Sequence, residues 1–102
     1  MSKLWTVELT SRAKKQLRRL EKEQKEVFEI YQFFERDLMI NGPALSTWPN
    51  YTKERGCGKG IDKRHCHLKK GKPTWVACYE VINKKVRLLE VYYVGTHEKA
   101  PY

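Results

Sequence analysis

The chain has 102 residues, of which 40% are hydrophobic, enough for the core of a single domain covering residues 1–102. No apolar run approaches the ~20 residues that a membrane span requires, and residues 1–5 lack the apolar region of a signal peptide. We therefore expect a cytoplasmic protein with no membrane partner. The formal net charge is +9, which favours a polyanionic partner.

The positive charge is concentrated in two segments. Residues 1–24 contain seven Lys/Arg and three acids, and residues 53–72 contain eight and two. Binding to a polyanion is favoured because neutralised phosphates release counterions. Nucleic acid is the partner that we expect, although the charge alone fits an acidic protein equally well.

The first half of the chain predicts a strand and two helices. Residues 4–9 alternate largely between apolar and polar and indicate a strand. Thr10 or Ser11 then supplies an N-cap, and helical spacing of apolar residues begins at Ala13. A second helical stretch covers residues 27–38, and 41–43, Asn-Gly-Pro, ends it.

The two helical stretches leave an alternative open. No Gly or Pro separates them, and the apolar phase continues across Gln24, so one long helix that dimerises as a coiled coil is possible. A two-helix hairpin needs only a short break within residues 21–25. We favour the hairpin because it is more compact.

The second half predicts three antiparallel strands. Residues 43–63 contain two prolines and three glycines and are expected to be irregular. Extended stretches follow over 61–69, 74–82 and 86–94, with a turn at 71–73 and a tight hairpin at 83–85. The predicted fold is α+β: a strand, a helical hairpin, then antiparallel strands in one twisted sheet with both helices on one face.

The three cysteines do not indicate a disulfide framework or a metal site. Their number is odd, and no CxxC or HxxxH pair exists. In a strand, Cys66 points away from His65 and His67, which weakens a zinc site formed with them. We expect no metal and no other cofactor, and we interpret Cys66 and Cys78 as small buried hydrophobic residues.

The three histidines indicate proton-transfer chemistry. Period two places His65 and His67 on one strand face, and if Cys66 faces the helices this is the open face. His97 follows another strand of the same sheet. RNA can be cut without a metal when a base activates its 2′-hydroxyl, an acid protonates the leaving 5′-oxygen and cations hold the phosphate. Histidines with nearby Lys and Arg can fill these roles.

Aromatic residues could hold the bases of a single strand, because such bases stack on aromatic rings. The candidates are Trp75, Tyr92, Tyr93 and Tyr102. For Tyr92 and Tyr93 we favour packing within the sheet.

Two stretches carry a family resemblance. Residues 75–86, Trp-Val-Ala-Cys-Tyr-Glu-Val-Ile-Asn-Lys-Lys-Val, and the tail 94–97, Val-Gly-Thr-His, resemble the RelE/ParE toxin superfamily, nearest its YafQ-like branch. The first strand, the basic helix around 13–17 and the strand order also match, whereas residues 43–60 match poorly. The resemblance implies the fold described above, with the helical hairpin.

The resemblance also implies a function. It implies the toxin of a bacterial type II toxin–antitoxin system, a metal-independent endoribonuclease that cleaves messenger RNA on the ribosome and so inhibits translation. The implied partners are a cognate antitoxin protein, the ribosome and mRNA, and operator DNA only through the antitoxin complex. ParE-like members instead inhibit gyrase without cutting RNA, and this is the main alternative. A nucleic-acid-binding module with incidental histidines is a third.

The matching positions suggest site residues. His97, His67 and His65 occupy positions of family catalytic or phosphate-contacting residues, and Tyr102 lies near a carboxy-terminal aromatic residue of the family. Trp75 matches a functional tryptophan of the YafQ-like branch. Two positions differ: Thr74 replaces an aspartate of these relatives, and Val76 an arginine of RelE.

These observations give one hypothesis for the site. His65, His67, His97 and Tyr102 are the predicted catalytic group, in which the histidines transfer protons or hold the phosphate and Tyr102 stacks or relays protons. The residues that we predict to bind RNA are Lys53, Arg55, Arg64, Trp75 and Lys99.

Overall fold

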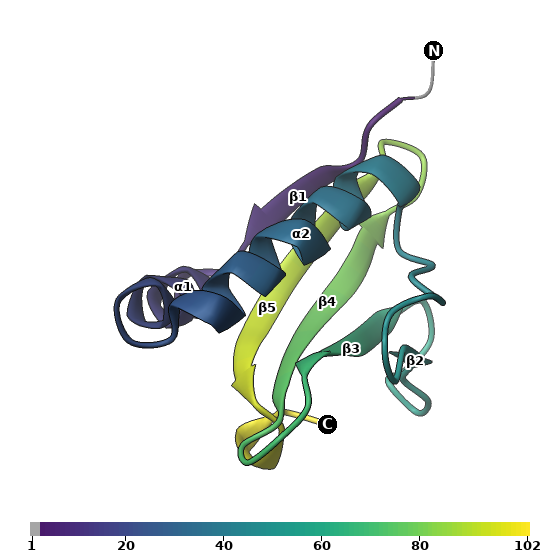
Figure 1. Ribbon diagram of the computed structural model, residues 1–102. Helices are drawn as coiled ribbons and strands as arrows, with labels where there is room; N and C mark the ends of the chain where they lie inside the picture. Colours follow the sequence, from purple (N-terminus) through teal and green to yellow (C-terminus); the bar gives the residue numbers. More distant parts are fainter. Residues whose placement is uncertain (1–2) are drawn as a thin grey trace.

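Two helices cover one face of a five-stranded sheet in the computed structural model, which describes residues 3–102 (Figure 1). The strand order is β1-β5-β4-β3-β2, with β1 parallel to β5 and every other pair antiparallel. This arrangement confirms the predicted α+β fold. The strands are β1 (Thr6–Leu9), β2 (Thr52–Lys53), β3 (Lys63–Lys69), β4 (Trp75–Asn83) and β5 (Leu88–Thr96).

The helices form the predicted hairpin. They are α1 (Ser11–Glu23) and α2 (Lys25–Asn41), and the break lies at Gln24, whose φ of −138° and ψ of 67° are not helical. The Thr10 hydroxyl accepts a hydrogen bond from the Ala13 N–H at 3.1 Å and caps α1. Each helix has a buried apolar stripe, and the break lets both stripes pack on the same sheet. Within residues 3–102, neither helix is long and apolar enough to cross a membrane.

The main core lies between the helices and the sheet. Phe34 of α2 contacts Tyr79 of β4, with ring centroids 5.6 Å apart, and Cys66 and Leu68 of β3 join the same cluster. A smaller cluster on the opposite face contains Cys78. Cys66 and Cys78 are both buried, as predicted. Burial raises the pKa of each thiol to about 12, which keeps it protonated.

The second half departs from expectation in three places. Residues 43–63 were predicted to be irregular, but Thr52–Lys53 forms an edge strand on β3. Strand β5 continues to Thr96, past its predicted end at 94, and a 3₁₀ turn, η1 (His97–Lys99), follows. The β4–β5 turn is longer than predicted because the Asn83 side chain accepts hydrogen bonds from the N–H groups of Lys85 and Val86.

Candidate active site

The three histidines and Tyr102 meet on the face of the sheet that the helices leave open. The ring centroids of Tyr102 and His65 are 3.8 Å apart, those of His67 and His97 5.5 Å, and those of His97 and Tyr102 5.8 Å. Figure 1 shows the C-terminal segment turning back beneath the ends of β3 and β4. We call these four side chains the histidine cluster. His65 and His67 lie on the strand face that was predicted for them, and residues 97 and 102 contact them there, in agreement with the predicted group.

The tail reaches the sheet because β5 ends in a folded-back turn. The Tyr93 hydroxyl donates a hydrogen bond to the Thr96 carbonyl at 2.7 Å, and the His97 N–H donates to the Thr74 carbonyl at 2.8 Å. A Cβ at Gly95 would lie 2.7 Å from the Tyr93 hydroxyl oxygen. Because residue 95 is glycine, the Tyr93 side chain can pack against the backbone there and reach the Thr96 carbonyl. This hydrogen bond holds the turn that directs His97 toward β3.

His67 is held in an environment that favours its neutral form. Burial lowers the pKa of His67 below the ordinary value of 6.5, and positive charge on His97, His65 and Lys70 lowers it further. The Nδ1 atom is buried and has no hydrogen-bond partner within residues 3–102. A neutral imidazole can accept a proton at neutral pH. Because Nδ1 is buried, Nε2 is the ring nitrogen that can accept a proton from a ligand.

Glu54 orients His65. Its carboxylate Oε2 contacts the Nδ1 atom of His65, and the exposed fractions of the two side chains are only 18% and 9%. A carboxylate accepts from Nδ1–H, which leaves Nε2 of the neutral ring with its lone pair. Glu54 was not among the predicted site residues because β2, the strand just before it that pairs with β3, was not predicted.

Tyr102 is both a stacking surface and a hydrogen-bond donor. Burial, with smaller contributions from neighbouring acidic groups, raises the pKa of the Tyr102 phenol to about 12. The hydroxyl therefore stays protonated at neutral pH. The side chain is still 43% exposed, so a ligand can reach it.

Two lysines near the cluster were also missed. The Lys63 ammonium lies 5.2 Å from the ring centroid of Tyr92, on the strand face that carries His65. Tyr92 packs against the smaller cluster, in agreement with the packing interpretation. The parity of β3 would have identified Lys63. Lys70 follows β3 directly and contributes positive charge at His67.

Among the described residues, no group of three or more His, Cys, Asp or Glu side chains is arranged to hold a metal ion.

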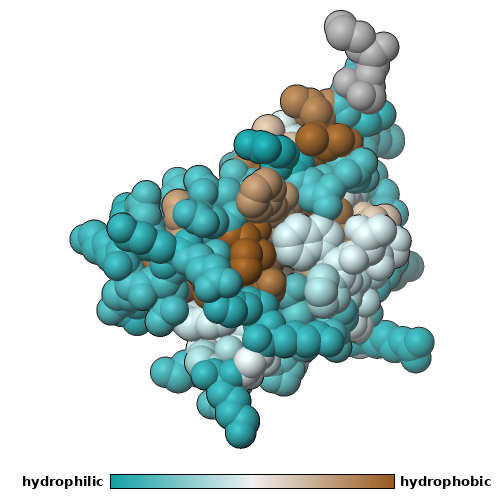
Figure 2. Space-filling view, viewed as in Figure 1, coloured by the Kyte–Doolittle hydropathy of each residue, from teal (hydrophilic) through white to brown (hydrophobic). Residues whose placement is uncertain are grey.

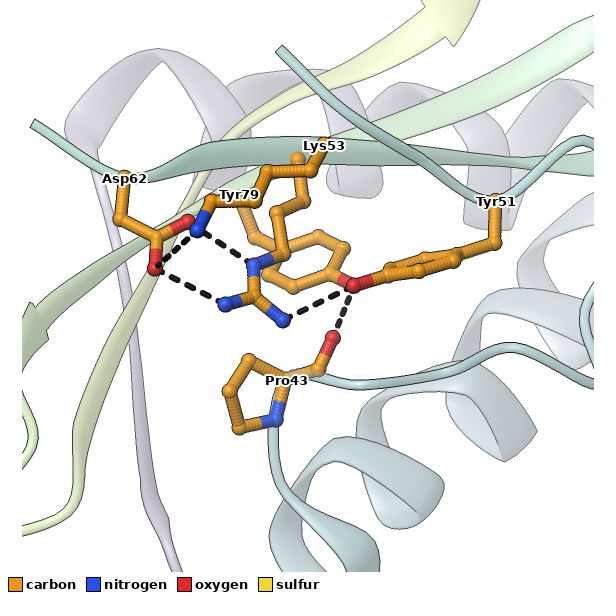
Figure 3. Close-up of polar contacts among 6 residues, drawn as sticks. Pro43, Tyr51, Lys53, Asp62 and Tyr79 are labelled. Carbon is orange, nitrogen blue, oxygen red and sulfur yellow. Dashed lines mark hydrogen bonds and ion pairs between the residues drawn. The ribbon is translucent and has the colours of Figure 1, made fainter.

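The prediction that Arg64 binds RNA does not agree with its place in the structure. Arg64 is 8% exposed and lies on the helix-covered face, where its Nε and one terminal nitrogen donate to the Asp62 carboxylate, both at 2.8 Å. Its other terminal nitrogen donates to the Tyr51 hydroxyl at 2.8 Å (Figure 3). This pairing raises the Arg64 pKa and lowers that of Asp62. The guanidinium charge is thus already neutralised inside the protein.

The remaining predicted RNA-binding residues are not part of the histidine cluster. The Lys53 ammonium is 3.9 Å from Asp62 but 59% exposed (Figure 3), and Arg55 is exposed in the turn that follows. Trp75 packs against the main core, and together with Lys99 it borders a cavity beside α1. The structure therefore does not bring Trp75 to the histidines.

The chain was compared with family models, curated proteins and solved structures, and none of the three comparisons gave a match. The resemblance to the RelE/ParE superfamily therefore stays a prediction.

Proposed function

We propose that this chain is the toxin of a bacterial type II toxin–antitoxin system and acts as a metal-independent endoribonuclease. One observation carries the proposal: three histidines and a tyrosine, from three separate segments, meet on an open face of a strongly basic protein. Such a cluster offers a base and an acid for RNA chemistry at neutral pH.

In the proposed reaction, His67 is the base and His97 the acid. Neutral His67 takes the proton of the RNA 2′-hydroxyl, whose oxygen then attacks the adjacent phosphorus. The bond from phosphorus to the 5′-oxygen breaks, and protonated His97, whose ring is 5.5 Å from that of His67, donates its proton to this oxygen. The products are a 2′,3′-cyclic phosphate and a 5′-hydroxyl end.

The other cluster residues hold the substrate. When both of its ring nitrogens carry a proton, His65, oriented by Glu54, can donate a hydrogen bond from Nε2 to a phosphate oxygen. The protonated Tyr102 hydroxyl can donate another. Lys63 and Lys70 add positive charge on the same side, where negative charge develops in the transition state.

The proposed partners follow from the same function. Messenger RNA on the ribosome is the substrate, cleavage inhibits translation, and a cognate antitoxin neutralises the protein. Operator DNA is contacted only through the antitoxin complex. The net charge of +9 supports a polyanionic substrate.

Induced expression in bacteria tests the proposal. Wild type, His97→Ala and a control, Lys85→Ala, are compared by growth, by amino-acid incorporation and by primer extension on a reporter transcript. His97 is exposed, so its replacement should not unfold the protein, and Lys85 lies in the distant β4–β5 turn. We expect wild type and control to stop translation and cut the transcript, and His97→Ala to cut it at least about a hundredfold more slowly.

Other outcomes separate the alternatives. Equal growth arrest by wild type and His97→Ala would overturn the assignment of His97. Arrest with intact transcripts and an induced DNA-damage response would indicate a gyrase inhibitor of the ParE kind. No toxicity, with RNA binding that weakens steeply with salt, would indicate a simple nucleic-acid-binding module.

A further inference from the structure

A cavity of about 530 Å³ lies on the helix side of the sheet, apart from the histidine cluster. One wall is α1, and the other is formed by the ends of β4 and β5 together with η1. The residues that matter here are Arg12, Lys15, Arg19, Trp75 and Lys99, all of which line it. Figure 2 shows that α1 presents a largely hydrophilic surface on the left of the molecule.

Some of the positively charged side chains that line the cavity are not paired with an acid of the protein. Arg19 pairs with Glu23 at 3.8 Å, and Arg12 lies over the Tyr93 ring at 5.3 Å. Lys15 and Lys99, by contrast, form no ion pair with any acid within residues 3–102, and both are exposed. With Glu98 as the remaining acid of the lining, the cavity is suited to an anion.

The cavity also has an aromatic wall. Trp75 is half-buried, with part of its side chain packed on the main core and the rest bordering the cavity. An indole fixed by core packing gives a base a rigid surface on which to stack, at little entropic cost. Cations beside an exposed aromatic face are the combination that recognises a nucleotide.

The cavity adjoins the histidine cluster across a single turn. His97 and Lys99 are the two ends of η1: His97 belongs to the cluster and Lys99 borders the cavity. Trp75 is the register partner of Thr96, which immediately precedes this turn. A single strand that leaves the cluster over η1 therefore reaches the cavity directly.

We propose that this cavity binds a nucleotide of single-stranded RNA next to the cleaved bond. Its phosphate interacts with Lys15 and Lys99, and its base stacks on Trp75. The identity of the ligand rests on the proposed function, whereas the cationic and aromatic character of the site does not. An acidic protein segment is the competing occupant, and the indole wall favours RNA.

A binding measurement with matched variants tests this site. A fluorescent RNA of ten nucleotides, made resistant to cleavage by 2′-O-methyl groups, is titrated with each protein and followed by anisotropy. Lys15→Ala/Lys99→Ala removes two charges from the cavity. Lys14→Ala/Lys22→Ala removes two charges from exposed positions of α1 that do not line it.

We expect the cavity variant to bind at least about tenfold more weakly than wild type, and the control within about threefold. The slope of log K against log salt should fall by about 1.4 in the cavity variant, since each phosphate contact in a single strand contributes about 0.7. Equal weakening in both variants would overturn the proposal. So would displacement of the RNA by polyglutamate of matched charge as readily as by unlabelled RNA.

Failure of the proposed function would look different. His67→Ala/His97→Ala should abolish cleavage, and in that background the two cavity substitutions should weaken RNA binding by the same factor as in wild type. If wild type cuts no transcript while the cavity variant alone loses RNA binding, the nuclease proposal fails and the cavity stands as an RNA site. If cleavage is normal and the cavity variant binds like the control, the cavity proposal fails alone.

Discussion

The ring of Tyr102 lies flat against the ring of His65, with centroids 3.8 Å apart and planes only 6° from parallel. The contact joins the last residue of the chain to the middle of β3. Glu54 approaches the same imidazole through Nδ1, so two groups from different segments fix the orientation of one histidine.

The stacking contact predicts different effects of two substitutions at Tyr102. Tyr102→Phe keeps the aromatic face and loses only the hydroxyl's hydrogen bond to the phosphate, so it should lower the cleavage rate less than Tyr102→Ala. Tyr102→Ala removes it, frees the His65 ring and should lower kcat/KM about tenfold, as expected for a loss of ~1–1.5 kcal/mol of aromatic interaction. Single-turnover cleavage of an RNA by ribosome-bound protein measures both. Equal loss in the two variants would assign the role to the hydroxyl.

Glu54→Gln should weaken cleavage through His65. The amide cannot accept from Nδ1–H with the charge of a carboxylate, so the ring loses its fixed tautomer. Because Glu54 acts through His65, its loss cannot exceed that of His65→Ala, and we expect about tenfold against about a hundredfold. The double variant should match His65→Ala alone. Additive losses in the double variant would show that Glu54 acts independently.

His67 should titrate below the ordinary histidine range. Burial is the main cause of the lowered pKa, so we expect an NMR titration of the imidazole to have its midpoint below 6.5. His97→Asn removes a neighbouring positive charge and should raise the pKa of His67, but by less than burial lowers it, since the charge is the smaller cause. In the wild-type protein, the acidic limb of the cleavage profile should report the same pKa of His67. A midpoint at or above 6.5 would contradict the role of neutral base.

The lowered pKa of His67 also affects how the stability of the protein depends on pH. A histidine with a lower pKa in the folded state binds fewer protons than in the unfolded chain. Its contribution to stability is therefore complete above pH 6.5 and is lost as the pH falls through the folded-state pKa. Urea unfolding of wild type and His67→Gln between pH 7.5 and 5 should show a steeper decline for wild type.

Asp62→Asn should destabilise the protein without a matching loss of RNA affinity. It leaves the buried Arg64 guanidinium without its carboxylate, which we expect to cost about 3 kcal/mol in the free energy of unfolding. Lys53→Met, at a side chain that is 59% exposed, should change it by no more than about 0.5 kcal/mol. Urea denaturation measures both. Unchanged stability in Asp62→Asn would contradict a structural role for this ion pair.

Much of the fold could be predicted because its signals are local. The apolar stripes of 13–20 and 27–38 identify two helices, and the alternation along 64–68 already separates His65 and His67 from Cys66 and Leu68. The apolar pattern alone did not distinguish a helical hairpin from one long helix, and the hairpin was preferred because it is more compact. The hairpin is correct, because both apolar stripes must pack on one sheet.

The sequence by itself thus determined the order of the two helices and the four longer strands, the basic character of the chain and the face on which His65 and His67 lie. Tertiary structure decided the rest. The path of the loop before β3 brings Glu54 to His65 and neutralises Arg64. The packing of β4 and β5 beneath α1 places Trp75 at the cavity. The contacts of His65 with Glu54 and of Arg64 with Tyr51 join β3 to an irregular segment more than ten residues earlier, so only folding brings them together.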